Sequence, residues 1–378
     1  MKFIHLSDLH IGKRLHEAPL IEDQEYVLDK ILEITVKEAP EGVIIAGDVY
    51  DKAVPSTEAV AVFDGFLVRL AAAVPHVFIV SGNHDSAERL AFGARLMEGE
   101  GIHVSPVYSG ECRSVALADE HGRVNVYLLP FVKPATVRRY FENERIESYT
   151  DAVRAALSSI ELNEGERNIL VTHQFVAGGV ALDSEELSVG GSDCVDASVL
   201  SGFDYVALGH LHRPQNTAEN IRYSGSPLKY SFSEARDEKS VTVLELGKKG
   251  EMSVRVLPLT PLHEVRRLRG NYDELAARDF YNGTTLREDY VEITLTDEEE
   301  IPEAMGKLRA IYKNLLSFSY DNKRTRAGTN VDLPAALPER SPYELAAELY
   351  RIQNGSELSR EQSKLLRELI DDIWEGET

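Results

Sequence analysis

Short runs of apolar, β-branched residues recur along the first two-thirds of the chain, and each run stops at a polar side chain able to bind a metal ion. In the clearest case, residues 77–80 lead through Gly82 to Asn83 and His84. Continuous apolar runs of this length are typical of strands in a parallel sheet covered on both faces. Ligands of such sheets bind beyond the carboxyl ends of the strands, so the pattern predicts a polar site there.

The same arrangement occurs at four further places. Residues 3–7, 43–47, 169–172 and 205–209 are followed by Asp8 and His10, by Asp48, by His173, and by His210 and His212. Any one such residue is more commonly a cap or turn former, but their recurrence after successive strands favours one shared ligand set. Carboxylate, imidazole and carboxamide groups suit manganese, iron, zinc or magnesium rather than a thiolate site.

The spacing of these candidate ligands predicts which of their side chains point in the same direction. Asp8 and His10 are two residues apart, as are His210 and His212, so in extended chain each pair points to one side. Asn83 and His84 are adjacent and therefore diverge. We expect Asn83 to face the metal ions and His84 to face the bound substrate.

The remaining pattern predicts an α/β fold, a two-sheet β-sandwich flanked by helices. Helical periodicity predicts helices near residues 22–38, 56–72, 86–97 and 152–160. The apolar face of residues 56–72 is expected to pack either on the sheet or on another subunit. A strand is expected at 124–129, and strands at 221–224, 241–246 and 252–257 are expected to complete the second sheet as antiparallel neighbours.

The pattern changes near residue 261. A strand at 290–295, a helix at 301–312 and a strand at 315–320 predict a small α+β unit, and a linker containing Gly328, Pro334 and Pro338 follows. Helix start signals at Ser341 and Ser359 then predict a pair of short helices. The expected domains are 1–258, 259–327, the linker 328–340, and 341–378.

Net charge argues against strong DNA binding by this chain alone. The formal charge is −22 over 378 residues, whereas duplex binding depends on neutralising phosphates with Lys and Arg. Basic clusters occur at 13–14, 133–139, 266–269 and 323–326, and each is interpreted as a solvated face rather than a phosphate contact. The acidity therefore predicts reliance on a partner.

Further features of the sequence bear on the cellular location, on disulfides and on nucleotide binding. No apolar run is long enough to span a membrane, and the first residues read as a strand rather than a signal peptide, which predicts a cytoplasmic protein. Cys112 and Cys194 lie outside every motif, so no disulfide is expected. No GxxxxGK[ST] loop is present, so any ATP dependence must come from another chain.

These motifs carry a family resemblance. Asp8-Leu9-His10, Gly47-Asp48, Gly82-Asn83-His84-Asp85, His173 and Gly209-His210-Leu211-His212 resemble, in order, the signature of the calcineurin-like metallophosphoesterases. Segments 1–12, 47–56 and 223–234 are similar to the SbcD branch, the nuclease subunits of bacterial SbcCD complexes. The resemblance covers essentially the whole chain.

The resemblance implies a pair of divalent cations, most simply Mn²⁺, with Mg²⁺, Fe²⁺ and Zn²⁺ as alternatives. Asp48 is expected to bridge them. Asp8, His10 and His212 complete the first site, and Asn83, His173 and His210 the second. Two such cations hold a phosphodiester and activate a water for in-line attack.

Roles outside the ligand set also follow from the resemblance. His84 is the expected proton donor or hydrogen-bond donor to the leaving oxygen. Asp85 either orients His84 or caps the following helix. Asp51 stands where archaeal and eukaryotic relatives have a second substrate-facing histidine, and its role is open.

The resemblance further implies a nuclease in DNA repair, recombination and replication that acts on double-strand ends as an exonuclease and on hairpins as an endonuclease. It implies a homodimer through helices near 56–72 and 86–97, and an SbcC-type coiled-coil ATPase bound to 341–378 rather than a helix pair folded on its own domain. The alternative is a small-molecule phosphodiesterase or phosphatase. A non-catalytic scaffold is disfavoured, because every expected ligand position carries a side chain able to bind a metal ion.

Overall fold

The structure is a computed structural model that describes residues 1–181, 193–323, 325, 342–354 and 357–376. The chain divides into two compact units, Met1–Asn322 and Lys323–Thr378.

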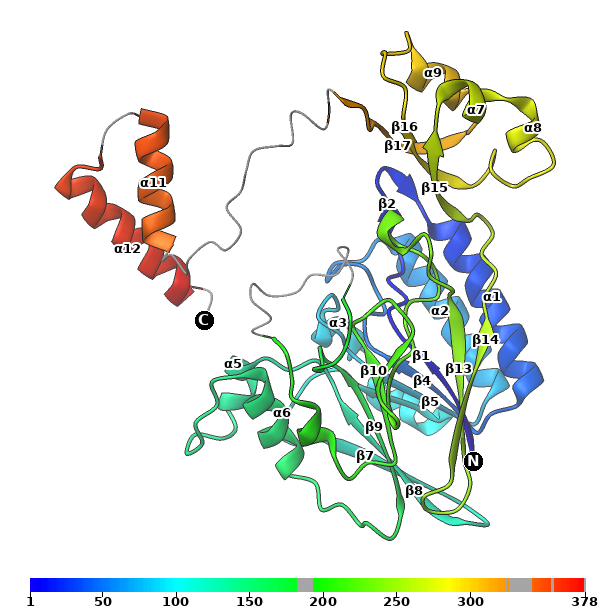
Figure 1. The fold of residues 1–378 in the computed structure, drawn as a ribbon. Helices are drawn as coiled ribbons and strands as arrows, with labels where there is room; N and C mark the ends of the chain where they lie inside the picture. The colour runs from blue at the N-terminus through cyan, green and yellow to red at the C-terminus, as the bar shows by residue number, and fades with distance from the viewer. Residues whose placement is uncertain (182–192, 324, 326–341, 355–356, 377–378) are drawn as a thin grey trace. The chain divides into compact units, whose positions relative to one another are not determined.

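Two six-stranded sheets form the centre of the first unit (Figure 1). In the first sheet, order β14-β13-β1-β4-β5-β6, four strands are parallel: β1 (Lys2–Leu6), β4 (Gly42–Ala46), β5 (His76–Val80) and β6 (Ile102–Ser105). In the second, order β11-β12-β10-β9-β8-β7, the parallel strands are β12 (Ile221–Tyr223), β10 (Tyr205–Gly209), β9 (Arg167–His173) and β8 (Gly122–Leu129). β11 (Gln215–Ala218) and β7 (Arg113–Asp119) are antiparallel edges.

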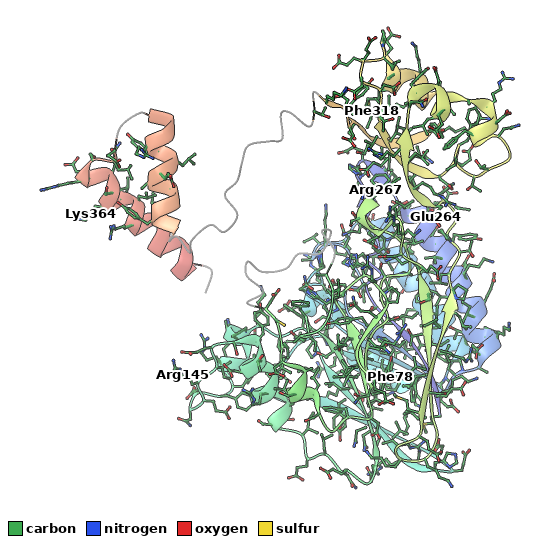
Figure 2. The ribbon with its side chains drawn as sticks, viewed as in Figure 1. Phe78, Arg145, Glu264, Arg267, Phe318 and Lys364 are labelled. Atoms are coloured by element: carbon green, nitrogen blue, oxygen red, sulfur yellow. The ribbon has the colours of Figure 1, made fainter. Side chains whose placement is uncertain are left out.

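Alternating residues of the first sheet face two different layers. Phe3, Ile44 and Phe78 are buried against the second sheet, as Figure 2 shows for Phe78. Ile45 and Ile79 instead face the layer that contains α1 (Ile21–Glu38) and α2 (Thr57–Ala73). Because both faces are covered, the strands carry uninterrupted apolar runs. The predicted sandwich flanked by helices is confirmed.

The prediction for the strands after His212 is partly wrong. β13 (Ser240–Leu246) and β14 (Met252–Pro258) join the first sheet rather than the second, with β13 antiparallel to β1. β12 does lie in the second sheet, but parallel to β10. An apolar strand pattern specifies burial, whereas the partner strand is decided by long-range packing that the pattern does not encode.

Shorter elements complete the sandwich. They are β2 (Arg14–Leu15), β3 (Ala18–Pro19), α3 (Ala87–Leu90), α4 (Ala94–Met97), α5 (Pro134–Arg138) and α6 (Tyr149–Ser158). Cys112 and Cys194 are both free thiols.

A three-stranded parallel sheet follows β14. It contains β15 (Val265–Gly270), β16 (Tyr290–Leu295) and β17 (Asn314–Tyr320), with α7 (Tyr272–Ala276), α8 (Arg278–Tyr281) and α9 (Ala304–Arg309). α9 is shorter than the predicted helix 301–312 because Glu303 adopts a left-handed φ of 56° at its N-cap. Asp23 of α1 accepts hydrogen bonds from the His263 backbone (3.0 Å) and the Tyr290 hydroxyl (2.8 Å). The domain boundary at 258/259 stays a prediction.

The second unit contains α11 (Pro342–Asn354) and α12 (Arg360–Gly376). The expected capping box is present: the Ser359 N–H donates to Gln362 Oε1 (2.9 Å) and the Gln362 N–H to Ser359 Oγ (3.2 Å). Gln362 also bonds the Tyr350 hydroxyl of α11 (3.1 Å). The predicted linker 328–340 and the predicted cap at Ser341 lie outside the described residues. Among the helices that the structure describes, none is long and apolar enough to cross a membrane.

Candidate metal centre

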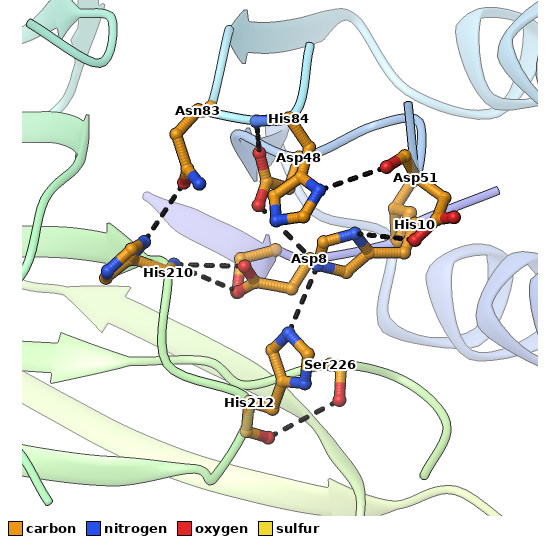
Figure 3. Close-up of polar contacts among 12 residues, drawn as sticks. Asp8, His10, Asp48, Asp51, Asn83, His84, His210, His212 and Ser226 are labelled. Atoms are coloured by element: carbon orange, nitrogen blue, oxygen red, sulfur yellow. Dashed lines mark hydrogen bonds and ion pairs between the residues drawn. The ribbon is translucent and has the colours of Figure 1, made fainter. Parts of the chain in front are cut away.

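The polar residues that follow the apolar strands meet at one edge of the sandwich. The first sheet delivers Asp8 and His10 after β1, Asp48 after β4 and Asn83 after β5, while the second delivers His173 at the end of β9 and His210 and His212 after β10. Figure 3 shows side chains from both sheets converging on one space. The structure therefore brings together every residue that the sequence predicted as a metal ligand.

His10 and His212 form the first half of this cluster with Asp8. Their Nε2 atoms lie 3.1 Å apart, and His10 Nε2 is 3.5 Å from Asp48 Oδ2. Ligand atoms of Asp8, His10 and His212 all lie within 4.8 Å of one another. Asp8 also accepts the His210 N–H at 3.0 and 3.2 Å, which ties the loop after β1 to the loop after β10.

Asn83 is the centre of the second half. Its Oδ1 lies 3.0 Å from His173 Nε2 and 3.1 Å from His210 Nδ1. His173 Nε2 is also 3.3 Å from Asp48 Oδ2. The same carboxylate oxygen of Asp48 therefore faces both halves of the cluster.

The donor atoms fit divalent cations. The facing Nε2 atoms of His10 and His212 repel each other when both carry lone pairs, and a cation between them removes that repulsion. His210 Nε2 is buried without a hydrogen-bond partner among the described residues. Buried polar atoms of this kind are rare unless an ion or water satisfies them. Oxygen and imidazole ligands without thiolate suit Mn²⁺, Mg²⁺, Fe²⁺ or Zn²⁺.

Burial sets the charges of these groups. Burial raises the pKa of Asp8, and it lowers the pKa of His210 to about 3, so His210 is neutral near pH 7. For Asp48, burial opposes ionisation, but the His173 charge holds its pKa below the usual value. Burial likewise opposes protonation of His173, yet the Asp48 carboxylate raises its pKa to about 9. Asp48 and His173 thus stabilise each other's charged form, and a cation bound beside Asp48 would take the place of the His173 proton.

The backbone at four of these residues is strained. Asp8, His10, Asp48 and His210 have φ angles of 53°, 43°, 49° and 105°. Non-glycine residues in this region cost about 1–3 kcal/mol each, and such residues concentrate at functional sites. These backbone conformations occur in the loops after β1, β4 and β10, which direct their side chains into the cluster.

Two glycines let the sheets approach closely beside the cluster. A Cβ on Gly209 would lie 1.9 Å from the Ala46 carbonyl oxygen, and a Cβ on Gly47 would lie 2.3 Å from His173 Nδ1. His173 Nδ1 is hydrogen-bonded to that same Ala46 oxygen (2.8 Å). Only glycine fits at positions 47 and 209 without displacing the neighbouring strand.

His84 lies beside the first half of the cluster rather than between the two halves. Its backbone N–H donates to Asp48 Oδ1 (2.9 Å), and its Nδ1 lies 3.0 Å from the Asp51 carbonyl oxygen. A ligand atom of His84 lies within 4.8 Å of those of His10 and Asp48. The side chain is half-buried, so it can reach both the cluster and a bound substrate.

Asp85 does not cap the following helix, and its role in orienting His84 stays a prediction. Its carboxylate accepts the backbone N–H groups of Gly82 (2.9 Å), Val49 (3.1 Å) and Tyr50 (3.0 Å). Ser86, not Asp85, caps α3. Asp85 therefore fixes the loop after β5 to the loop after β4, which carries Asp48.

Sequence reasoning assigned no role to several buried polar residues behind the cluster. Gln24 Nε2 donates to the His10 carbonyl (2.7 Å), and Glu234 Oε1 lies 3.2 Å from His212 Nδ1. Burial would raise the pKa of Glu234, but the Lys239 ammonium and the bond to His212 lower it to about 2. The resemblance at segment 223–234 was the available signal for Glu234.

Two of the four basic clusters of the sequence, 13–14 and 266–269, contain residues paired with acids. Lys13 pairs with Asp51 (2.6 Å). On β15, Arg266 pairs with Asp289 (3.3 Å), Arg267 with Glu292, and Arg269 with Asp321 (2.6 Å). These four cations therefore already have carboxylate partners, and the interpretation of the basic clusters as solvated faces stays a prediction.

Comparison with known proteins assigns the family. Residues 1–214 match the calcineurin-like phosphoesterase family, and residues 261–354 match the type 5 capsule protein repressor C-terminal domain. The SbcD subunit of the SbcCD nuclease from Staphylococcus epidermidis is 30% identical over 386 residues, which covers 100% of both chains. The chain belongs to the SbcD branch of the calcineurin-like phosphoesterase family. It is accordingly a metal-dependent phosphoesterase.

Solved structures also align with this phosphoesterase, at low similarity. A dimetal phosphatase from Danio rerio is 14% identical with a TM-score of 0.40, covering 69% of this chain and 98% of its own. The protein TT1561 of Thermus thermophilus is 12% identical with a TM-score of 0.38, covering 68% and 98%. The family assignment rests on the sequence matches.

Proposed function

We propose that this phosphoesterase is a two-metal DNA nuclease that cleaves double-strand ends as an exonuclease and hairpins as an endonuclease. The observation that carries the proposal is the position of Asp48 Oδ2, which is 3.5 Å from His10 Nε2 and 3.3 Å from His173 Nε2. One short carboxylate facing two ligand groups is the arrangement that a pair of cations requires.

Each residue of the cluster has a definite task in this proposal. Asp48 bridges the two cations; Asp8, His10 and His212 hold the first, and Asn83, His173 and His210 hold the second. Mn²⁺ is the proposed metal. Bound there, the cations would polarise the phosphodiester and lower the pKa of a water.

His84 acts on the leaving group. Its Nδ1 donates to the Asp51 carbonyl, which fixes the ring and leaves Nε2 to exchange a proton with the departing oxygen. Asp48 Oδ1 accepts a hydrogen bond from the His84 backbone N–H. The bridging carboxylate and the proton donor are therefore held in a fixed position relative to each other. Asp48 and His84 are the proposed catalytic residues.

DNA as substrate is supported by the full-length similarity to a protein named as part of a nuclease. The net charge of −22 and the acid-paired arginines of β15 favour weak DNA affinity without a partner. We propose an SbcC-type coiled-coil ATPase as that partner, bound to residues 341–378. Leu349, Leu365 and Leu369 there are 55%, 57% and 49% exposed, as expected of an apolar docking face.

We also propose a homodimer through residues 56–72 and 86–97. Phe63 and Phe66 of α2 pack in the core of the sandwich, so they do not supply this contact. Phe92 and Leu96 are 87% and 85% exposed, and Phe92 lines a cavity of about 480 Å³ together with Phe63 and Leu67. Large apolar side chains this exposed favour a subunit interface. The cytoplasmic location stays a prediction.

The deciding experiment compares substrates. The purified protein with Mn²⁺ is incubated with end-labelled duplex DNA, with hairpin DNA and with a simple aryl phosphodiester. We expect cleavage of both DNA forms, and about a 10²–10⁴-fold lower rate for His84→Gln, the usual contribution of a general acid. The variant should bind Mn²⁺ as the parent does.

Two results would contradict the proposal. Cleavage of the aryl ester without cleavage of DNA would favour the alternative, a small-molecule phosphodiesterase or phosphatase. A His84→Gln variant as fast as the parent would remove His84 from the mechanism while leaving the metal ligands in place.

A further inference from the structure

Segment 226–239 lies behind the first half of the metal centre and contains two buried charges that the proposed reaction does not use. Glu234 is 0% exposed and Lys239 is 5% exposed. Lys239 Nζ lies 2.7 Å from Glu234 Oε2, so the charges compensate each other. A buried pair of this kind adds little stability over apolar residues of similar volume, so its contacts indicate its role.

Both charges contact His212. Glu234 Oε1 lies 3.2 Å from His212 Nδ1, and Lys239 Nζ donates to the His212 carbonyl oxygen (2.8 Å). An ionised carboxylate only accepts hydrogen bonds, so Nδ1 of His212 must carry the proton. The lone pair is then on Nε2, the atom that faces His10.

A second chain of the same composition lies behind His10. Asp51 Oδ1 is 3.9 Å from His10 Nδ1 and 2.6 Å from Lys13 Nζ. The order, imidazole then carboxylate then ammonium, repeats that of His212, Glu234 and Lys239. The difference is that 3.9 Å is too long for a hydrogen bond, and His10 Nδ1 is buried without a partner in the described part of the chain.

We propose that Glu234 and Asp51 are positioning residues for the first cation site. Glu234 holds the Nδ1 side of His212 by a hydrogen bond, and the Asp51 carboxylate lies beside Nδ1 of His10, so that each Nε2 faces the cation; Lys239 and Lys13 hold the two carboxylates in place. This inference rests on the ligand roles proposed above for His10 and His212. Carboxylates behind ligand histidines fix the ring tautomer and orientation, and their loss weakens metal binding about 10–100-fold.

The test measures Mn²⁺ binding directly, without DNA. Free Mn²⁺ is counted from its electron paramagnetic resonance signal during titration of the full-length protein. For Glu234→Gln we expect one of the two Mn²⁺ sites to weaken about 10–100-fold while the other keeps its affinity. Asp51→Asn should weaken the same site by less, because its hydrogen bond to His10 is not formed. Glu238→Gln makes the same chemical change at an exposed neighbour and should bind as the parent.

A second variant excludes a simple folding defect. Glu234→Gln leaves the Lys239 charge without its partner, so the double variant Glu234→Leu/Lys239→Met removes both charges at once. We expect it to keep the parent melting temperature in EDTA and still lose Mn²⁺ affinity at one site. In ¹⁵N-histidine spectra, the Nδ1-protonated tautomer of His212 should be present in the parent and lost in the double variant.

Three outcomes separate the possibilities. Equal weakening of both sites in Glu234→Gln would indicate a structural role and overturn the proposal. Parent-like affinity and tautomer in the double variant would also overturn it, provided that His212→Ala loses one site. If His212→Ala keeps both sites, the ligand assignment itself fails, and the positioning role fails with it.

Discussion

The two ends of β9 handle buried charge in opposite ways. Arg167 at its start is 2% exposed and donates to Asp119 (3.1 Å), to the Gly247 carbonyl (2.9 Å) and to the Gly122 carbonyl (2.7 Å). His173 at its end lies in a cluster in which the Nε2 atoms of His10 and His212 face each other. About 20 Å of strand separates the two ends.

Both clusters connect the two sheets, but they differ in what is left over: the Arg167 cluster has its charge paired, whereas the His173 cluster has unpartnered imidazole nitrogens. At the Arg167 end, the guanidinium charge is neutralised by Asp119, and the two Nη atoms also donate to carbonyl oxygens, while Nε has no partner among the described residues. At the His173 end, His10 Nδ1 and His210 Nε2 lack partners among the described residues. A buried cluster whose charge is paired stabilises the fold, whereas one with surplus acceptors is suited to bind a cation.

The largest expected effect comes from breaking the first cluster. Arg167→Met leaves Asp119 with only the Met1 ammonium (2.9 Å) as an ion-pair partner, so we expect a loss near the lower end of the about 3–5 kcal/mol that removal of one member of a buried ion pair costs. Urea unfolding should show this loss with Mn²⁺ and with EDTA alike. A loss seen only with Mn²⁺ would mean that Arg167 acts on the metal centre.

A smaller effect is expected at the other end. Asp48→Asn removes the bridging carboxylate, so Mn²⁺ should no longer stabilise the protein. Ligand binding at 100 times Kd stabilises a protein by about 2.7 kcal/mol, which is the difference expected between the parent with Mn²⁺ and with EDTA. Differential scanning fluorimetry should show that shift in the parent and none in Asp48→Asn. A retained shift would place the cations elsewhere.

The smallest effect concerns acid. The hydrogen bond from Arg167 holds the pKa of Asp119 well below its usual range. Since its folded pKa is depressed, Asp119 contributes stability above its unfolded pKa of about 4, and that stability is lost as pH falls further. Asp119→Asn should therefore flatten the stability profile below about pH 4 relative to the parent, measured by urea unfolding in EDTA. Parallel profiles would contradict this role.

The sequence was informative wherever chemistry followed directly from a buried strand. The ligand residues were predicted because apolar runs such as 43–47 and 77–80 end at polar side chains, and the carboxyl ends of parallel strands share an edge. Family resemblance added the division into two sets, in which the structure places Asn83 with His173 and His210.

The remaining features depend on contacts between distant segments. The position of β13 beside β1 is decided by pairs such as Phe3 with Leu244, which no local pattern encodes. β15 was missed because its arginines interrupt the apolar signal. Asp85 was misread as a candidate helix cap because its partners, Val49 and Tyr50, lie in another loop.

The close approach at Gly47 and Gly209 has a consequence for how the enzyme can vary. Bulky side chains separate the two sheets through most of the sandwich, but at the metal edge the gap narrows until backbone meets backbone. The two sheets are therefore closest at the edge that carries Gly47 and Gly209, and this close approach brings the ligand atoms of opposite sheets within reach of one ion. The substitution Gly209→Ala would add a methyl group that pushes the two sheets apart at this edge. Such a variant would keep its hydrophobic core and bind the cations more weakly.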